Sequence, residues 1–140
     1  MAIAATVVEV DDIVTRFDDQ VVHDGVSFDV FKGTLVALIG GSGTGKSVLL
    51  REIIGLQRPT AGRIRLLGTD VWNSSEEEMN ATRRRFGMMF QDGALFSSLT
   101  VAENVAVPLT EHARVPNGML KALVHLRLAQ AGLDPDAASK

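Results

Sequence analysis

The sequence predicts an α/β fold in which a parallel strand, buried on both faces, leads through a glycine-rich loop into a helix. Three observations predict this arrangement. Residues 34–39 form an apolar run without alternation, which is typical of a strand covered on both sides. The richest glycine cluster of the chain follows directly. Beyond it, apolar residues recur at helical spacing over residues 48–56, with Arg51 and Glu52 expected to face outward.

The composition is that of a globular domain. The 140 residues are 46% hydrophobic, and their formal net charge is only −3, which argues against intrinsic disorder. The chain has no cysteine, so disulfides and thiolate zinc sites are excluded. A sequence pI of about 5.5 argues against nucleic-acid binding. Because no signal peptide or membrane-spanning apolar stretch is evident, we expect a cytoplasmic chain.

Apolar patterns and turn residues predict the other elements. Residues 6–31 are expected to form antiparallel strands, and shorter strands are expected at residues 64–67 and 86–90, the latter with Met88 and Met89 in the core. Helices are expected to begin at Ser74 or Ser75 and at Thr100, because each of these residues is followed three positions later by a glutamate, as in a capping box. A last helix is expected over residues 119–131.

The glycine cluster matches the motif G-x-x-x-x-G-K-[ST] in full, through Gly40, Gly41, Ser42, Gly43, Thr44, Gly45, Lys46 and Ser47. Glycine lets the backbone curl so that successive N–H groups point at phosphate oxygens. Lys46 would then contact the β- and γ-phosphates, and the Ser47 hydroxyl would ligate Mg²⁺. The motif therefore predicts a nucleoside triphosphate site, against the alternative of a glycine-rich turn that binds nothing.

With this loop in the form G-x-S-G-x-G-K-S, the chain resembles the ATP-binding-cassette (ABC) ATPases over almost its whole length. The resemblance implies a P-loop NTPase of the ABC ATPase type, with N-terminal antiparallel strands, a parallel core strand and the start of a helical subdomain. It also implies that the chain is the N-terminal part of one ATP-binding domain. Residues 1–91 would form the nucleotide-binding core, and residues 92–140 the Q-loop and helical subdomain.

The resemblance also implies roles for two residues outside the loop. Phe17 lies where the family places an aromatic side chain that stacks on adenine, although a strand-end core aromatic is the alternative. Gln91 corresponds to the glutamine of the family's Q-loop, which reaches Mg²⁺ and the attacking water. An amide oxygen suits this role because it can ligate a hard cation without adding charge. ATP and Mg²⁺ are thus the expected cofactors.

The stretches 90–96 and 99–112 are similar to the ATPase subunits of Mla and related MCE-type lipid transporters. This similarity implies three partners: a second ATPase subunit, a membrane permease and an MCE-type substrate-binding protein. It also implies a place at the inner membrane through the permease. Leu95, Phe96 and Leu99 could form the groove that receives a permease helix, or they could be the core of the helical subdomain.

Elements that the family needs for hydrolysis do not occur between Gln91 and Lys140: an Asp-Glu strand end, a serine-glycine signature and a switch histidine. We therefore expect negligible ATPase activity from residues 1–140 alone. Two other interpretations stay open, namely a truncated, non-catalytic nucleotide-binding interaction module and a P-loop phosphotransferase for small molecules. His23, His112 and His125 are too far apart in sequence to predict a metal site.

Overall fold

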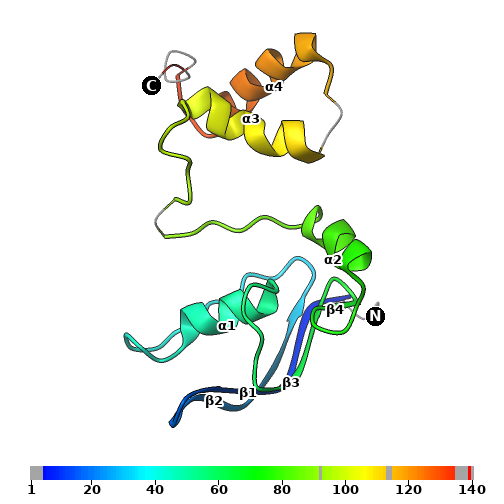
Figure 1. Ribbon diagram of the computed structural model, residues 1–140, viewed down its shortest axis with the longest axis vertical. Coiled ribbons are helices and arrows are strands. Elements are labelled where there is room, and N and C mark those ends of the chain that lie inside the picture. The colour runs from blue at the N-terminus through cyan, green and yellow to red at the C-terminus, as the bar shows by residue number, and fades with distance from the viewer. Residues whose placement is uncertain (1–4, 92, 113–114, 135–138, 140) are drawn as a thin grey trace. The chain divides into compact units, whose positions relative to one another are not determined.

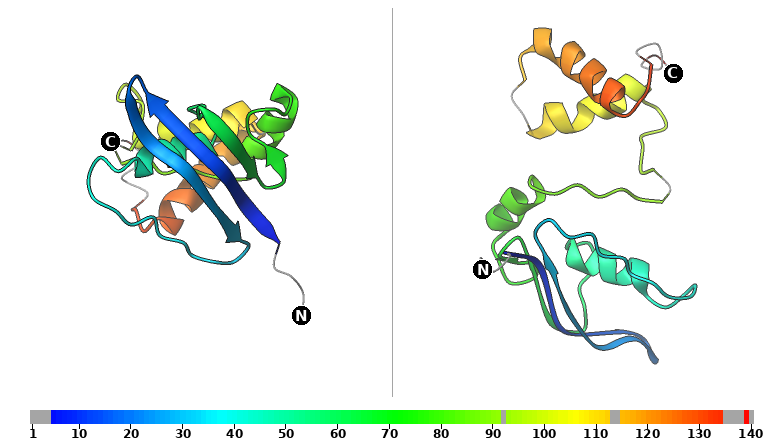
Figure 2. Two further views of the ribbon diagram at one scale, coloured as in Figure 1. Left: turned by 90° about the horizontal axis from the view of Figure 1, so that it is seen from below. Right: turned by 180° about the vertical axis from the view of Figure 1, so that it is seen from behind.

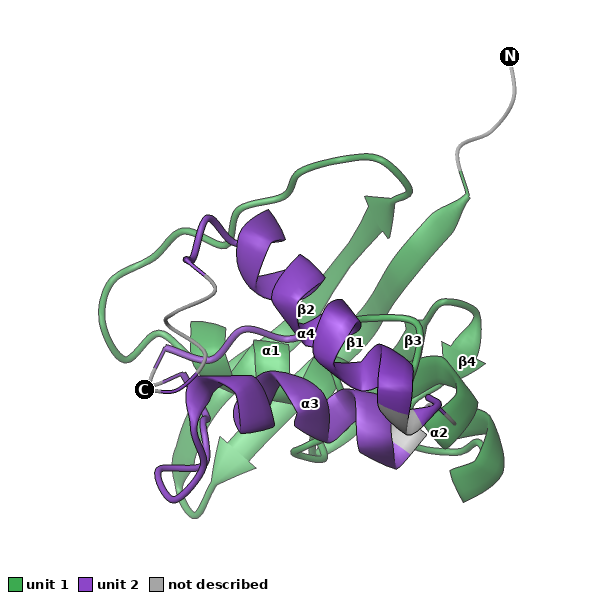
Figure 3. Cartoon of the chain, turned by 90° about the horizontal axis from the view of Figure 1, so that it is seen from above, with its two compact units in different colours: residues 1–87 green, residues 88–140 purple. Residues whose placement is uncertain are grey.

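The computed structural model describes residues 5–91, 93–112, 115–134 and 139. The chain forms two compact units, residues 1–87 and residues 88–140 (Figure 3). The first unit contains the sheet and the glycine-rich loop. The second contains a pair of helices.

A four-stranded antiparallel sheet forms the first unit, with β1 (Thr6–Phe17) and β2 (Gln20–Phe31) as its long strands (Figure 1). The strand order is β2-β1-β3-β4, where β3 spans Ala61–Leu66 and β4 spans Thr69–Asp70. The β1–β2 hairpin closes through two aspartates, and Phe17 pairs with Gln20 across the turn. The predicted N-terminal antiparallel strands are confirmed.

Two helices complete the first unit, α1 (Lys46–Ile53) and α2 (Glu76–Arg83). The apolar side of α1 packs on the sheet, and the shared core consists of Val10, Ile13, Leu49, Ile53, Ile64, Leu66, Val71 and Met79. Of the two capping boxes that the sequence allows, α2 begins with the one at Ser75: the amide of Glu78 donates to the Ser75 hydroxyl, and the amide of Ser75 donates to the Glu78 carboxylate.

Two apolar segments differ from the sequence prediction. Residues 34–39 and 86–90 are not strands in this structure, and residues 32–45 run from β2 to α1 as a long loop (Figure 2). The side chains of Leu35 and Ile39 are 100% and 93% exposed, and Met89, expected in the core, is 91% exposed. A strand needs a neighbouring backbone for its hydrogen bonds, and none of the described strands pairs with either segment.

The second unit is built on α3 (Val101–His112) and α4 (Asn117–Gln130), which pack against each other. Among its described residues, Val124 and Leu128 of α4 are the most buried apolar ones. Helix α3 begins with the predicted capping box between Thr100 and Glu103 and continues past Pro108. Within the described ranges, none of the helices is both long and apolar enough to cross a membrane.

Candidate nucleotide site

The glycine-rich loop, residues 40–47, leads directly into α1. Its backbone has positive φ angles at Gly43 (79°) and Gly45 (85°), a conformation that residues other than glycine rarely adopt. The Thr44 hydroxyl donates to the carbonyl of Gly41 at 2.9 Å, which closes the curl. The sequence therefore places glycine where this loop needs it.

Lys46, the first residue of α1, folds its side chain back over the loop. Its Nζ atom donates to the carbonyl oxygens of Gly40 at 2.8 Å and Gly41 at 2.5 Å. The ammonium group of Lys46 thus lies between two carbonyl oxygens of the loop, which accept its hydrogen bonds. Phosphate oxygens would present the same kind of acceptor with a full negative charge, which makes a stronger hydrogen bond.

A hollow of about 310 Å³ lies at the start of α1. It is lined by Gln20, Val22, Gly43, Thr44, Gly45, Lys46, Ser47 and Val48. The first amide groups of a helix have no partner within the helix and form its positive end. The exposed side chain of Ser47 adds a hydroxyl oxygen. The free amide groups fit a nucleotide phosphate, and the Ser47 hydroxyl oxygen fits its Mg²⁺ ion.

Behind the loop lies a buried polar network that the sequence did not predict. His23 of β2, Thr15 of β1 and Glu52 of α1 are 6%, 2% and 0% exposed. The Thr15 hydroxyl donates to Glu52 Oε1 at 2.6 Å, and His23 Nδ1 lies 3.0 Å from Thr15 Oγ1 and 3.3 Å from Glu52 Oε2. On the other side of the ring, His23 Nε2 lies 3.2 Å from the carbonyl oxygen of Gly45.

Glu52 corrects the expectation that it faces outward with Arg51. Arg51 is exposed, but Glu52 is completely buried because its carboxylate has partners on the strands. The position of Glu52 in the sequence could have indicated its burial, because it lies between Leu49 and Ile53, which are both on the buried side of α1. A charged residue in such a position indicates a buried partner.

Phe17 and Gln91, the two site residues outside the loop, lie in different units. The side chain of Phe17, at the end of β1, is 45% exposed, which removes the alternative of a core aromatic. Gln20, from the same hairpin turn, lines the hollow at α1. Gln91 is exposed and belongs to the second unit, so its role stays a prediction.

Leu95, Phe96 and Leu99 line a hollow of about 430 Å³ in the second unit. Leu95 and Phe96 are 71% and 58% exposed, so these two are not core residues of the helical unit. Leu128 and Leu133 line the same hollow. Its lining is predominantly apolar, as expected for a surface that receives an apolar side chain or helix.

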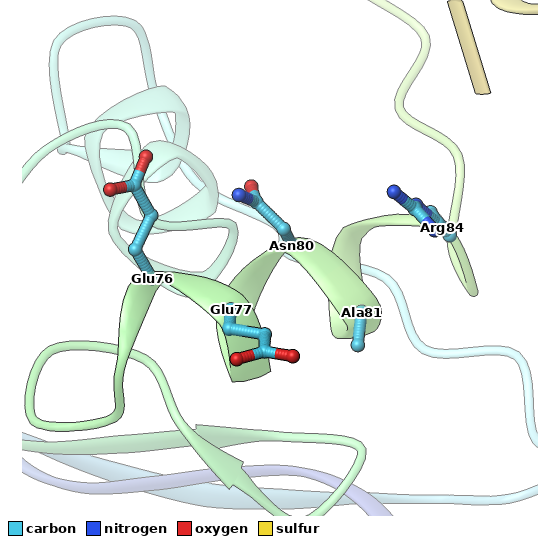
Figure 4. A pocket seen from close by; sticks show the side chains of 5 residues that line it. All are labelled: Glu76, Glu77, Asn80, Ala81 and Arg84. Carbon is cyan, nitrogen blue, oxygen red and sulfur yellow. The ribbon is translucent and has the colours of Figure 1, made fainter.

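A further shallow hollow lies on the first unit, along the exposed face of α2 (Figure 4). It is lined by Glu76, Glu77, Asn80, Ala81 and Arg84, whose side chains are all exposed. Met79 and Thr82, on the other side of the helix, are buried. The hollow is therefore the solvated face of an amphipathic helix, and it contains none of the predicted site residues.

A family model described as ABC transporter matches residues 23–138. The chain belongs to the ABC transporter family. Its relatives include the intermembrane phospholipid transport system ATP-binding protein MlaF of Haemophilus influenzae, 37% identical over 94% of this chain and 50% of that protein. The probable ribonucleotide transport ATP-binding protein mkl of Mycobacterium leprae is 39% identical over 92% of this chain and 37% of that protein.

Another ABC relative is the methionine import ATP-binding protein MetN of Rhizobium johnstonii, 44% identical over 77% of this chain and 30% of that protein. The ATP-binding cassette MJ0796 in a dimeric post-hydrolysis state with ADP and Pi has a similar structure, with a TM-score of 0.83 and 25% identity. That match covers 94% of this chain and 60% of the cassette. The ABC ATPase fold is confirmed, and the chain spans half or less of the length of the three ATP-binding relatives and 60% of the cassette's length.

Proposed function

We propose that this chain is the nucleotide-binding part of the ATP-binding subunit of an ABC transporter. The observation that carries the proposal is the loop geometry: Lys46 turns back over the loop carbonyls at the start of α1, beside the exposed Ser47 hydroxyl. Membership of the ABC transporter family supports ATP as the nucleotide.

Each residue then has a defined role. The loop amides and Lys46 would bind the phosphates of ATP, and the hydroxyl of Ser47 would ligate Mg²⁺. Phe17 stacks on the adenine ring, which its exposed side chain allows. Gln91 would supply an amide oxygen to the Mg²⁺ ion and to the attacking water, as the family resemblance implies. Magnesium, when bound, would supply charge neutralisation at the β- and γ-phosphates.

Hydrolysis requires groups that residues 1–140 do not provide by themselves. Phosphoryl transfer depends on positioned charges around the γ-phosphate, and here only the loop, Lys46, Ser47 and Gln91 are candidates. We therefore propose that these 140 residues bind Mg-ATP but turn it over negligibly when isolated. The complete subunit would dimerise around two nucleotides and hydrolyse them.

Lipid transport is the proposed use of this ATP. The MlaF relative, which covers 94% of this chain, supports an Mla-type system with a permease and an MCE-type substrate-binding protein as partners. The exposed apolar hollow at Leu95, Phe96 and Leu99 is the proposed docking surface for the permease. The subunit would thus act at the cytoplasmic side of the inner membrane. Relatives named for ribonucleotide and methionine transport are the competing assignments.

Calorimetric titration of the chain with Mg-ATP tests the proposal. We expect saturable binding that Lys46→Ala abolishes while the circular dichroism spectrum is unchanged. Lys32→Ala is the matched control, since Lys32 is an exposed lysine that directly follows β2 and lies outside residues 40–47. Equal binding by Lys46→Ala and the unmodified chain would disprove the proposed site.

A further inference from the structure

We infer that His23 is a positioning residue for the phosphate-binding loop, held by Thr15 and Glu52 so that its Nε2–H fixes the carbonyl of Gly45. The inference rests on the proposed function of this loop. Its basis is the chain of contacts from Glu52 through Thr15 and the His23 ring to Gly45.

The network joins three separate elements behind the loop. Thr15 comes from β1, His23 from β2 and Glu52 from α1. Burying three polar side chains costs free energy unless they bond to one another, so their mutual contacts hold both strands to the helix. A histidine fixed on its Nδ1 side has little freedom to turn its Nε2 side away from Gly45.

The direction of the hydrogen bond to Gly45 follows from the acceptor. A carbonyl oxygen can only accept, so the His23 Nε2 atom at 3.2 Å donates a hydrogen to it. The Thr15 hydroxyl gives its single hydrogen to Glu52, so His23 Nδ1 also donates, to the oxygen atoms of Thr15 and Glu52, and the contacts fit a ring with a hydrogen on both nitrogens. The same carbonyl also accepts from the amide of Leu49 at 2.9 Å, in the first turn of α1. Gly45 is thus the point where the network meets both the loop and the helix.

The Gly45 carbonyl matters because of peptide geometry. In a planar trans peptide, the C=O of one residue and the N–H of the next point in opposite directions. A carbonyl held toward His23 therefore turns the amide of Lys46 the opposite way. Lys46 lines the hollow at the start of α1, where the phosphates would bind. His23 sets the orientation of this amide without touching the nucleotide.

Two variants separate positioning from simple packing. His23→Gln keeps an N–H donor near the position of Nε2. His23→Leu combined with Glu52→Leu replaces the buried pair by apolar side chains of similar size, a change that often preserves stability. If the network served packing alone, the double variant would behave like the unmodified chain once folded. If it positions the loop, the double variant folds but loses the Gly45 contact.

The experiment measures three quantities on the 140-residue chain. We expect ring-nitrogen NMR to show His23 protonated at Nε2. Amide exchange of Leu49 should be about tenfold faster in the double variant and close to normal in His23→Gln. The affinity for Mg-ATP should fall about tenfold in the double variant and recover in His23→Gln.

Three results would overturn the inference: an Nε2 atom without hydrogen, unchanged Leu49 exchange in the folded double variant, or faster exchange with no loss of affinity. If the unmodified chain does not bind Mg-ATP, the proposed function fails. The ring-nitrogen spectrum and the exchange rates, measured without nucleotide, then decide whether His23 holds Gly45.

Discussion

Asn104 and Phe96 are joined by two hydrogen bonds across the start of α3. The amide of Phe96 donates to Asn104 Oδ1 at 2.8 Å, and Asn104 Nδ2 donates to the carbonyl oxygen of Phe96 at 3.1 Å. The same Nδ2 group also lies within hydrogen-bond distance of the carbonyls of Leu99 and Thr100. A single helical side chain thus holds the loop that carries the apolar residues of the proposed docking surface.

Asn104→Ala should release this loop. It removes the four hydrogen bonds that the Asn104 side chain makes with residues 96, 99 and 100, and we expect it to destabilise the second unit by about 1–3 kcal/mol. Cleavage by chymotrypsin after Phe96 should become faster. Asn80→Ala is the control, since Asn80 is exposed on α2 and bonds only locally to Arg83. Identical cleavage rates for the two variants would contradict the role of Asn104.

Gly45→Ala should destabilise the first unit more than Gly43→Ala. Both glycines have positive φ, so an alanine at either position is strained by about 1–2 kcal/mol. At Gly45, a Cβ atom would also lie 2.5 Å from Val22 Cγ1 and 2.6 Å from His23 Nε2, whereas at Gly43 it would meet nothing within 4 Å. Denaturant titration measures both. Equal losses of stability would show that the contact with His23 is loose.

The first turn of α2 should lose stability at acid pH. The Ser75 backbone amide and then its hydroxyl donate to the carboxylate of Glu78, which lowers the pKa of Glu78 below its ordinary value of 4.5. A lowered folded-state pKa adds stability above the unfolded value, and this stability is lost as pH falls through the folded value. The loss should therefore begin just below pH 4.5.

Glu78→Gln should remove this part of the pH dependence. Glu77→Gln, a change on the same exposed turn, is the matched control. Carboxyl chemical shifts of Glu78 and amide exchange across α2, followed down the acid range, provide the measurement. A Glu78 carboxyl that titrates at or above 4.5 would contradict the capping interaction.

Ser47→Ala should weaken the binding of ATP in the presence of Mg²⁺ by about tenfold and leave Mg²⁺-free binding nearly unchanged. The reason is that, in the proposed site, the hydroxyl would ligate the metal, whereas the loop amides and Lys46 would bind the phosphates directly. Ser42→Ala, at another exposed serine of the loop, is the control. Titrations with and without EDTA separate the two effects. A loss of affinity that does not depend on Mg²⁺ would assign Ser47 to phosphate binding.

Local features of the fold could be predicted from the sequence because their causes are local. The capping boxes at Ser75 and Thr100 need only residues three positions apart, and the loop at residues 40–47 needs only its glycines and Lys46. The N-terminal strands follow from alternation and turn residues. In each case the interacting groups are neighbours in the sequence.

The remaining features depend on partners that periodicity does not identify. The apolar run at residues 34–39 indicates side chains that require burial, but it does not say which backbone will pair with it, and in this structure no described strand does. His23 was similarly invisible. Its contacts are with Thr15 and Glu52, which are distant in the sequence. Thr15 lies 8 residues from His23, and Glu52 lies 37 residues from Thr15.

The exposed apolar side chains of residues 34–39, the run that pairs with none of the described strands, should make the chain self-associate. Leu35 and Ile39 are 100% and 93% exposed, and burying such side chains gains roughly 2 kcal/mol each. We expect Leu35→Ser with Ile39→Ser to reduce dye binding by exposed apolar surface and to shift sedimentation toward monomer. The free energy of unfolding should change by less than about 1 kcal/mol because neither side chain is buried.

Val10→Ser is the control, since Val10 is 3% exposed and its loss should unfold the sheet. A monodisperse, cooperatively melting monomer before any substitution would contradict this prediction.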